Sequence, residues 1–432
     1  MKRIVTICWI IIFVLVLSNC TENNSYIEIP EPNVEVNQEH LAKCLSHNTW
    51  TYHMMCHHYL WYSEMPDSSS LNFSIEPDVF FEKLKSKQDR FSWCELNKSF
   101  SKRDYGFEYQ TYEICGSIVS RILHVSSSYL IELGLKRGDY INVNNELLEK
   151  GIIENGYFIA QQIISLSNAT TKGTSLAPTV SLDSIYTINN KKVGYFVYNQ
   201  FESSTDVAQI TTKLNNIGID DLILDLRYNP GGYVSTSNYL ASMLAPIKHL
   251  GKLYQLQRYN DKLTKEKQKQ GGSGIDSVFL NKGFVTTQRN LNLSRLVVLT
   301  TKNTASASES LIIGLRPYMK VITIGTTSCG KDVGSYTIAD NNYKYQLQPI
   351  TFKYYNANNE STPTTGIVPD IYVEDDLDHQ RGDTNEALLK AAIEYLTGET
   401  LNTPNETAKS RSASQPKMQE VGRSSIEIKN NL

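Results

Sequence analysis

Residues 222–232 read LILDLRYNPGG, a mostly apolar run that ends in a turn containing proline and two glycines. The segment before it, VGYFVYNQF at 193–201, is rich in β-branched and aromatic residues, which favours a strand. Between them, residues 206–218 (DVAQITTKLNNIG) have the apolar spacing of a helix and end in glycine. A strand, a helix and a second strand in this order predict two parallel strands joined by a helical crossover.

The same alternation continues toward the carboxyl end of the chain. A helix through NYLASML (238–244) precedes the strand RLVVLTT (295–301), and a helix from Ala305 to Tyr318 precedes the strand KVITIGTT (320–327). For residues 185–398 we therefore predict the α/β fold class, with a largely parallel sheet covered by helices.

The region at 38–100 is aromatic and helical in pattern. Its segment PDVFFEKLKSK (77–87) fits an amphipathic helix, so a small N-terminal helical module is predicted. A module of this size cannot bury its aromatic side chains alone and must dock on another part of the chain. Cysteines and histidines also gather here, but within one helical stretch that lacks turns to wrap a tetrahedral site. We therefore predict no metal or other cofactor. Packing or surface roles are favoured for the residues concerned, which are Cys44, His47, His53, Cys56, His57 and His58.

Residues 101–180 change character and alternate short apolar segments with polar turns. The segment SSSYLIELGLKRGDYINVNNELL (126–148) predicts a short helix ending at Gly134, then a tight turn at 136–139 and a strand. Taken alone, a helix, a turn and a strand only suggest a corner of a mixed domain.

The first residues have the pattern of a secretory signal, in which a short basic head precedes an apolar run from Ile4 to Leu17. That run is shorter than the roughly 20 residues that a membrane-spanning helix needs. The tetrapeptide LSNC, ending at Cys20, resembles a bacterial lipobox, whose cysteine is acylated after cleavage. We expect a signal peptide at 1–19, a lipidated tether at 20–37 and a location in the bacterial cell envelope; plain secretion is the alternative.

The composition is that of a water-soluble globular protein, with 40% hydrophobic and 20% charged residues among 432. It excludes disordered, collagen-like and polytopic membrane chains. The net charge of −3 offers no basic excess for phosphate groups, so no nucleic-acid partner is expected.

The cysteines beyond Cys20 are odd in number and widely spaced, which allows at most one disulfide. Residues 399–432 are rich in Asn, Ser and Lys and predict a disordered tail.

Two loops at strand ends are candidates for chemistry. Ser306 and Glu309 match a capping box, S-x-x-E, so one interpretation of Ser306 is a simple helix cap. A serine at a helix start also lies among unpaired N–H groups, where an oxyanion would be stabilised. The glycines at 231 and 232 either form a plain turn or direct their N–H groups at a ligand.

Geometry selects Lys331 as the basic partner of Ser306. The helix from 306 to 318 carries the chain about 18 Å away at 1.5 Å per residue. The strand 321–327 returns it by roughly 20 Å at 3.3 Å per residue, so the loop with Lys331 arrives near the serine. The histidines of this domain, His249 and His379, have no comparable position. A lysine base must be neutral, which requires burial that lowers its pKa.

Together these motifs resemble the S41 carboxyl-terminal processing peptidases, serine proteases with a Ser–Lys dyad and a PDZ domain. The resemblance covers residues 40–396, and Ser306 and Lys331 have the 25-residue spacing of the family. The matching segments are LILDLRYNPGG (222–232), TASASES (304–310), GTTSCGK (325–331) and GIVPD (366–370).

The resemblance implies a role for each residue of the site. Ser306 would be the nucleophile and Lys331 the general base. The N–H groups of Ala307 and of Gly231 or Gly232 would form the oxyanion hole. The implied reaction is acyl-enzyme cleavage of protein or peptide substrates, near their carboxyl termini, with no cofactor.

Residues 101–180 resemble, in turn, a PDZ-like domain of the processing-protease type, in which "aGLkxGDxIxxVN" marks the same helix, turn and strand. The loop Tyr105-Gly106-Phe107-Glu108 stands where such domains cap the carboxylate of a peptide. An extended peptide would add a strand to the open edge of the sheet. This domain would present the substrate to the cleft or gate the cleft.

Two positions depart from the family pattern. Ser335 stands where members often carry a Gln or Glu that orients the lysine, and Ser328-Cys329 replaces the usual Thr-aromatic pair. Ser335 can still accept a hydrogen bond from the amine.

The alternative function is a weakly active or inactive peptide-binding module on a protease-like scaffold. A penicillin-binding acyltransferase is set aside because the S-x-x-K spacing is absent. The oligomeric state is not predicted.

Overall fold

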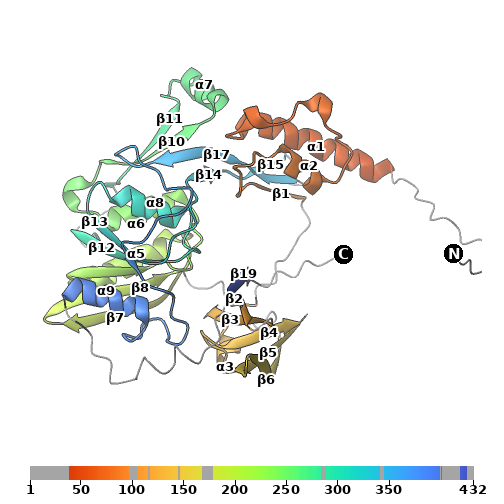
Figure 1. Ribbon diagram of the computed structural model, residues 1–432. Coiled ribbons are helices and arrows are strands. Elements are labelled where there is room, and N and C mark those ends of the chain that lie inside the picture. The colour runs from red at the N-terminus through yellow and green to blue at the C-terminus, as the bar shows by residue number, and fades with distance from the viewer. Residues whose placement is uncertain are drawn as a thin grey trace, which may run out of the picture.

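The computed structural model describes residues 38–96, 105–114, 117–144, 146–167, 179–283, 289–340, 345–398, 400 and 419–425. The predicted signal peptide, the lipidation site Cys20 and the tether to residue 37 lie outside this part of the chain. Figure 1 shows a helix-covered sheet, an N-terminal helical region beside an extended arm, and a separate β-rich unit.

The core of the molecule is a six-stranded sheet in the order β18-β13-β12-β9-β8-β7. All neighbouring pairs are parallel except β7 with β8, so the prediction of a largely parallel sheet is confirmed. The strands are β7 (Val180–Ile188), β8 (Lys191–Tyr198), β9 (Asp221–Asp225), β12 (Arg295–Thr300), β13 (Lys320–Gly325) and β18 (Ile371–Tyr372).

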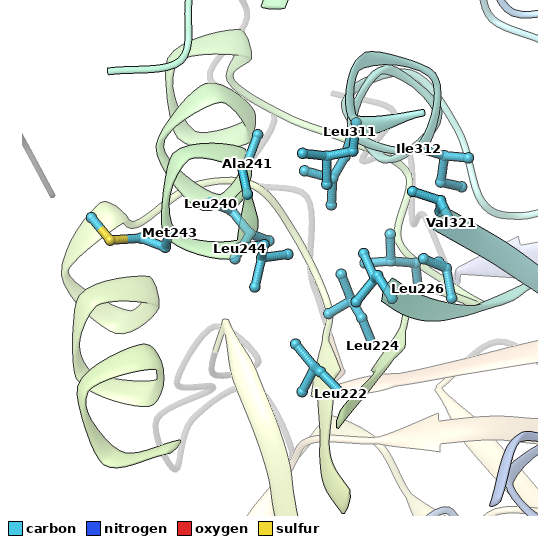
Figure 2. Packing of buried hydrophobic residues seen from close by; sticks show 14 of the residues in the cluster. Leu222, Leu224, Leu226, Leu240, Ala241, Met243, Leu244, Leu311, Ile312 and Val321 are labelled. Atoms are coloured by element: carbon cyan, nitrogen blue, oxygen red, sulfur yellow. The ribbon is translucent and has the colours of Figure 1, made fainter. Parts of the chain in front are cut away.

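Helices cover both faces of this sheet, because successive residues of a buried strand point to opposite sides. In β9, Leu222 and Leu224 join the core on one face while Ile223 joins the core on the other. Figure 2 shows the first of these cores, where α6 and α8 pack over β9. The first face is covered by α5 (Ser204–Ile217), α6 (Val234–Leu244) and α8 (Ala307–Leu315), and the second by α9 (Ala387–Thr397).

An antiparallel sheet, β11-β10-β17-β14, extends from this core as an arm (Figure 1). Its elements are η3 (Ile247–His249), β10 (Leu253–Tyr259), α7 (Asp261–Lys269), β11 (Ile275–Phe279), β14 (Val333–Ser335) and β17 (Ile350–Tyr355). Two further strands, β15 (Ile338–Ala339) and β16 (Tyr345–Gln348), form a second small sheet with β1 (Trp93–Leu96).

The N-terminal module docks on this arm. The sequence predicts such docking, because a module of this size cannot bury its aromatic side chains alone. Met55, Tyr59 and Phe80 share one core with Leu347 and Ile350. The module is not purely helical, however, because its strand β1 pairs antiparallel with β16, an association that only the tertiary structure provides. Its helices are α1 (Gln38–His58), η1 (Tyr62–Glu64), η2 (Ser68–Ser70) and α2 (Pro77–Leu84).

The β-rich unit is an antiparallel sheet in the order β19-β2-β3-β4-β5-β6. The predicted turn is present, since Lys136 N–H donates to Asp139 Oδ2 at 2.9 Å. The outer strand β19 comes from the tail that the sequence predicts to be disordered, so that prediction is wrong for these seven residues. The elements are β2 (Phe107–Ile114), β3 (Ser117–Val125), α3 (Ser128–Glu132), β4 (Tyr140–Asn144), β5 (Leu147–Glu154), β6 (Tyr157–Ser165) and β19 (Gln419–Ser425).

Two findings bear on the sequence predictions about membranes and cysteines. Within the described ranges, none of the helices combines the length and apolar character that crossing a membrane requires. Four cysteines of the described chain are free thiols, namely Cys44, Cys56, Cys94 and Cys329.

Candidate active site

Ser306 is the N-cap of α8 and has an unusual backbone, with φ 57° and ψ −112°. Among described residues, six other than glycine have positive φ, and the remaining five are asparagines, which tolerate this region. A strained serine costs of order 1–3 kcal/mol and persists only when its surroundings enforce it. The capping box with Glu309 is present, so the structural interpretation of Ser306 holds, but capping alone does not require this strain.

The glycine turn at the end of β9 lies directly against Ser306. A Cβ atom added at Gly231 would stand 2.8 Å from Ser306 Cβ and 2.9 Å from Ala307 N, closer than atoms pack. Asn229 connects the turn to the serine loop by two hydrogen bonds. Its backbone oxygen accepts Ala305 N–H at 3.0 Å and Ser308 Oγ–H at 3.1 Å. Residues far apart in sequence thus form one compact loop cluster.

The candidate oxyanion-hole donors differ in whether their N–H groups already donate a hydrogen bond. Gly231 N–H already donates to Asn229 Oδ1 at 2.9 Å, so it is committed to holding the turn. Within the described chain, neither Gly232 N–H nor Ala307 N–H donates to another protein group. Ala307 is also the first residue of α8, where the helix dipole favours negative charge. Of the two glycines that the sequence left open, Gly232 is the better donor.

Replacing Gly231 with alanine should strongly impair the site. Its φ of 107° is unfavourable for a side chain, and the new methyl group would push on Ser306. A displacement of about 1 Å in such a cluster costs around 10²-fold in activity. The measurement is the rate of cleavage of unfolded casein, with circular dichroism to verify folding.

Gly271→Ala is the matched control, because Gly271 has a similar φ of 89° but no atom within 4 Å of the added Cβ. It should keep activity near that of the unmodified chain. Equal activity in both variants would show that contact with Gly231 does not position Ser306.

Glu309 connects the serine loop to the lysine loop. Its fully buried carboxylate accepts hydrogen bonds on one oxygen, Oε2, from Ser306 N–H at 2.9 Å and Lys331 N–H at 2.8 Å. The other oxygen, Oε1, accepts Ser328 Oγ–H at 2.5 Å and Gly330 N–H at 2.7 Å. Burial raises the pKa of Glu309, while these four donors act in the opposite direction. The structure therefore brings the backbone N–H groups of Ser306 and Lys331 to a single oxygen atom.

The environment of Lys331 disfavours its charge. Burial lowers the pKa of this lysine below its ordinary value, although Cys329, Asp89 and Glu309 partly oppose the effect. Its Nζ lies 5.0 Å from the ring centre of Phe91, a cation–π contact that favours the charged form and so also opposes the effect of burial. A lowered pKa increases the neutral fraction that a general base requires.

The N-terminal module contributes directly to the lysine loop. Arg90 Nη2 donates to Gly330 O at 2.9 Å and to Thr364 O at 3.1 Å. The preceding Asp89 is buried and accepts the N–H groups of Phe91 and Ser92, both at 2.9 Å, which fixes the segment. Sequence analysis missed these residues, because no local signal indicates that a helical module reaches a site formed about 240 residues later.

The other motif positions have structural partners. Ser328 N–H donates to Ile367 O at 3.1 Å, which joins the GTTSCGK and GIVPD segments. Ser335 Oγ accepts Gln348 Nε2–H at 2.8 Å, and among described residues no hydrogen bond joins it to Lys331. Burial raises the pKa of the Cys329 thiol, which keeps it protonated. His379 pairs with Asp376 at 2.7 Å, on the side of the β-rich unit.

The β-rich unit contacts the glycine turn through Arg137, which lies in the predicted turn 136–139. Arg137 Nη2 is 2.7 Å from Asp375 Oδ1, and Nη1 donates to the Tyr228 hydroxyl. Burial acts to raise the pKa of Asp375, but Arg137 and Arg227 outweigh it and hold the pKa at about 2. Because Tyr228 immediately precedes the Asn229–Gly232 turn, this ionic cluster links the unit to the site.

The loop predicted to cap a peptide carboxylate leads into β2. Tyr105 and Phe107 are buried in the core of the unit. Gly106 has φ 73°, and its oxygen accepts N–H groups from Ser126 at 2.7 Å and Ser127 at 3.0 Å. The loop therefore packs closely against the start of α3, and Glu108 is the second residue of β2.

One side-chain cluster in the described chain has metal-ligand chemistry. Ligand atoms of His40, Cys44 and Glu76 lie within 4.8 Å of one another. Two of the three side chains are exposed, with His40 Nε2 lying 2.7 Å from Glu76 Oε1, and burial raises the pKa of the Cys44 thiol. The three ligand atoms are one fewer than the four that a closed structural zinc site requires, so the cluster is incomplete as a structural metal site.

A strained serine, a partly buried lysine and two available N–H groups form a site suited to acyl transfer, the chemistry of hydrolases. The chain belongs to peptidase family S41. Residues 192–373 match the description "Peptidase family S41" and residues 46–93 match "Peptidase S41 N-terminal domain". The resemblance inferred from the four motifs is confirmed.

Relatives agree with this assignment. The chain is 27% identical over 263 residues to a carboxyl-terminal-processing protease of Synechocystis, covering 59% of this chain and 53% of that protein. A protein of the same description from Picosynechococcus is 25% identical to this chain. The matched region covers 51% of this chain and 50% of that protein. The chain thus spans about half the length of these curated relatives.

A solved structure supports the fold. A crystal structure described as an S41 protease from Bacteroides fragilis superposes with a TM-score of 0.69 at 27% identity. It covers 81% of this chain and 97% of that one. The mixed α/β fold class is therefore that of S41 proteases.

Proposed function

We propose that this protein is an exported serine endopeptidase that cleaves proteins or peptides near their carboxyl termini, with Ser306 as nucleophile and Lys331 as general base. The observation that carries the proposal is the shared Glu309 oxygen, which holds the backbones of both residues. No cofactor enters the reaction.

The proposed reaction is acyl transfer in two steps. Neutral Lys331 takes the proton of Ser306 Oγ as that oxygen attacks the scissile carbonyl carbon. Gly232 N–H and Ala307 N–H stabilise the oxyanion, and the protonated lysine gives its proton to the leaving amine. A water molecule, deprotonated by Lys331, then attacks the acyl carbon. The bond from that carbon to Ser306 Oγ breaks, Lys331 returns the proton to Oγ, and the acid is released.

The β-rich unit would capture the substrate as a PDZ-like domain, by adding a peptide strand to β2. A cavity of about 630 Å³ separates this unit from the carboxyl ends of the central strands. Its lining includes Gln110 and Tyr112 of β2, Tyr228 just before the glycine turn, and Thr301 and Asn303 of the loop before Ser306. A peptide on β2 would therefore lie beside the segments that lead into the glycine turn and into Ser306.

A second candidate function is peptide binding without efficient catalysis. It is favoured by Ser335, because the hydroxyl in the position of the usual lysine-orienting residue is engaged by Gln348. The segment around Asp89, Arg90 and Phe91 offers an alternative means of holding Lys331. We therefore favour the peptidase.

The proposed location is the bacterial cell envelope, with a lipid anchor on Cys20. Support comes from the basic head, the apolar run from Ile4 to Leu17 and the LSNC tetrapeptide. Mass measurement of the mature protein tests this proposal, since acylation at Cys20 adds the mass of the lipid and plain secretion does not.

A serine-directed phosphonate tests the proposed function. It should label the purified protein at Ser306, as located by peptide mapping, and block cleavage of unfolded casein. Ser306→Ala should lose both the label and the activity. Ser310→Ala, one turn along α8 where Ser310 bonds to Gln255, should keep both.

Absence of label with peptide binding intact would support the binding module instead. Labelling at a residue other than Ser306 would exclude the proposed nucleophile.

A further inference from the structure

The C-terminal segment of this chain occupies the edge of the β-rich sheet. Strand β19 runs antiparallel to β2 over six residue pairs, from Gln419 opposite Glu113 to Ser425 opposite Glu108. The other neighbour of β2 is β3, so without β19 the strand β2 would be an edge (Figure 1). An edge strand presents a row of unpaired N–H and C=O groups that another strand can bind.

The direction of β19 is that expected for a captured peptide. Because the pairing is antiparallel, the carboxyl end of β19 lies at the start of β2, next to the loop at Tyr105–Phe107. This is the loop predicted to receive the carboxyl end of a peptide. The tail therefore uses the same edge, in the same polarity, as the proposed substrate.

The length of the connection allows the tail to reach this edge within one molecule. Helix α9 ends at Thr397, and residues 399–418 connect it to β19. Twenty residues can span up to about 70 Å when extended. Such a tether keeps a segment near its partner at an effective concentration on the order of 1 mM.

We propose that residues 419–425 are an intramolecular ligand of the β2 edge, which an external peptide must displace. This regulatory role rests on the proposed function, in which β2 captures the substrate. The tail acts as a competitor: it lowers the apparent affinity for external peptides and does not alter the chemistry at Ser306. Strand pairing uses backbone groups, so the competition does not require a particular tail sequence.

Proline substitution tests the contact in the full-length chain. Successive N–H groups of a strand point to opposite sides, so Arg423→Pro together with Ser424→Pro removes at least one bond to β2. Ala408→Pro, in the connecting segment, is the matched control. All three proteins carry Ser306→Ala, so that binding is measured without cleavage of the tail or the probe.

The probe is a fluorescein-labelled synthetic peptide of residues 417–428, titrated by fluorescence anisotropy. We expect the double-proline variant to bind it about 10- to 100-fold more tightly than the parent and the Ala408→Pro control, as competition at millimolar effective concentration implies. Equal affinities in all three proteins would overturn the proposal. So would failure of the peptide to bind the double-proline variant at 1 mM, which would show that β2 does not accept this segment.

Sedimentation distinguishes an intramolecular ligand from the tail of a second copy. The parent should keep one molar mass between low and high micromolar concentration. Self-association that the double-proline variant lacks would place a second copy's tail on the edge and overturn the intramolecular form. Because these readouts need no catalysis, an inactive enzyme would defeat the proposed function and leave the binding result intact.

Discussion

Lys331→Ala should reduce the cleavage of unfolded casein by at least about 10³-fold, because it removes the group that accepts the Ser306 proton. Lys331→Arg should be equally impaired, since a guanidinium stays protonated at any accessible pH. Lys320→Ala is the matched control. Lys320 is exposed on β13, the strand that leads to the same loop, and its loss should leave the rate nearly unchanged.

The pH dependence gives this prediction its specific form. Burial lowers the pKa of Lys331, so kcat/KM should rise with pH through a value below that of ordinary lysine and then level off. The free energy of unfolding should also increase with pH. Between the lowered folded pKa and the unfolded pKa, the unfolded chain binds more protons, so stability increases as pH rises. Lys331→Met should lack this increase.

Substantial activity in Lys331→Ala or Lys331→Arg would exclude lysine as the base. A rise of kcat/KM with its midpoint at or above the pKa of an ordinary lysine would contradict the lowered pKa.

Glu309→Ala should damage both stability and catalysis. The variant leaves the N–H groups of Ser306, Gly330 and Lys331 and one hydroxyl without their acceptor in a buried place. Each such loss costs about 1–3 kcal/mol before the structure relaxes, so we expect a total of roughly 3–5 kcal/mol. The kcat should fall about 100-fold, because the serine and lysine loops lose their common support.

Glu309→Gln separates the charge from the shape of this positioning residue. The amide retains one oxygen acceptor but turns an NH₂ group toward two of the four donors. We expect a smaller loss of stability than in Glu309→Ala, with kcat reduced and KM nearly unchanged. Thermal unfolding and steady-state kinetics measure the two effects.

Glu82→Gln is the control for this charge change. Glu82 is an exposed carboxylate on α2 that pairs with Lys85, and surface changes of this kind stay within about 0.5 kcal/mol. If Glu309→Gln kept full kcat, Glu309 would be a helix cap alone, and the shared oxygen would have no role in catalysis.

Local pattern was sufficient to predict the fold class and the two loops of the site. The alternation of apolar strands with helices specified a parallel sheet, because each strand must bury both faces under helices. The lengths of one helix and one strand were sufficient to predict that Lys331 returns near Ser306. These inferences succeed because the spacing of successive elements depends on residues adjacent in sequence.

Contacts between distant segments could not be predicted in this way. Pairing of β1 with β16 and of β19 with β2, the contact of Arg90 with Gly330, and the three bonds of Glu309 to residues 328, 330 and 331 join parts of the chain that no local pattern relates to one another. The sequence by itself determined the alternation of strands and helices, and it carries the motifs from which the nucleophile, base and oxyanion donors are predicted. Only the tertiary structure decided that Glu309 joins the serine and lysine loops and that the tail lies on β2, because both contacts depend on which distant segments the fold brings together.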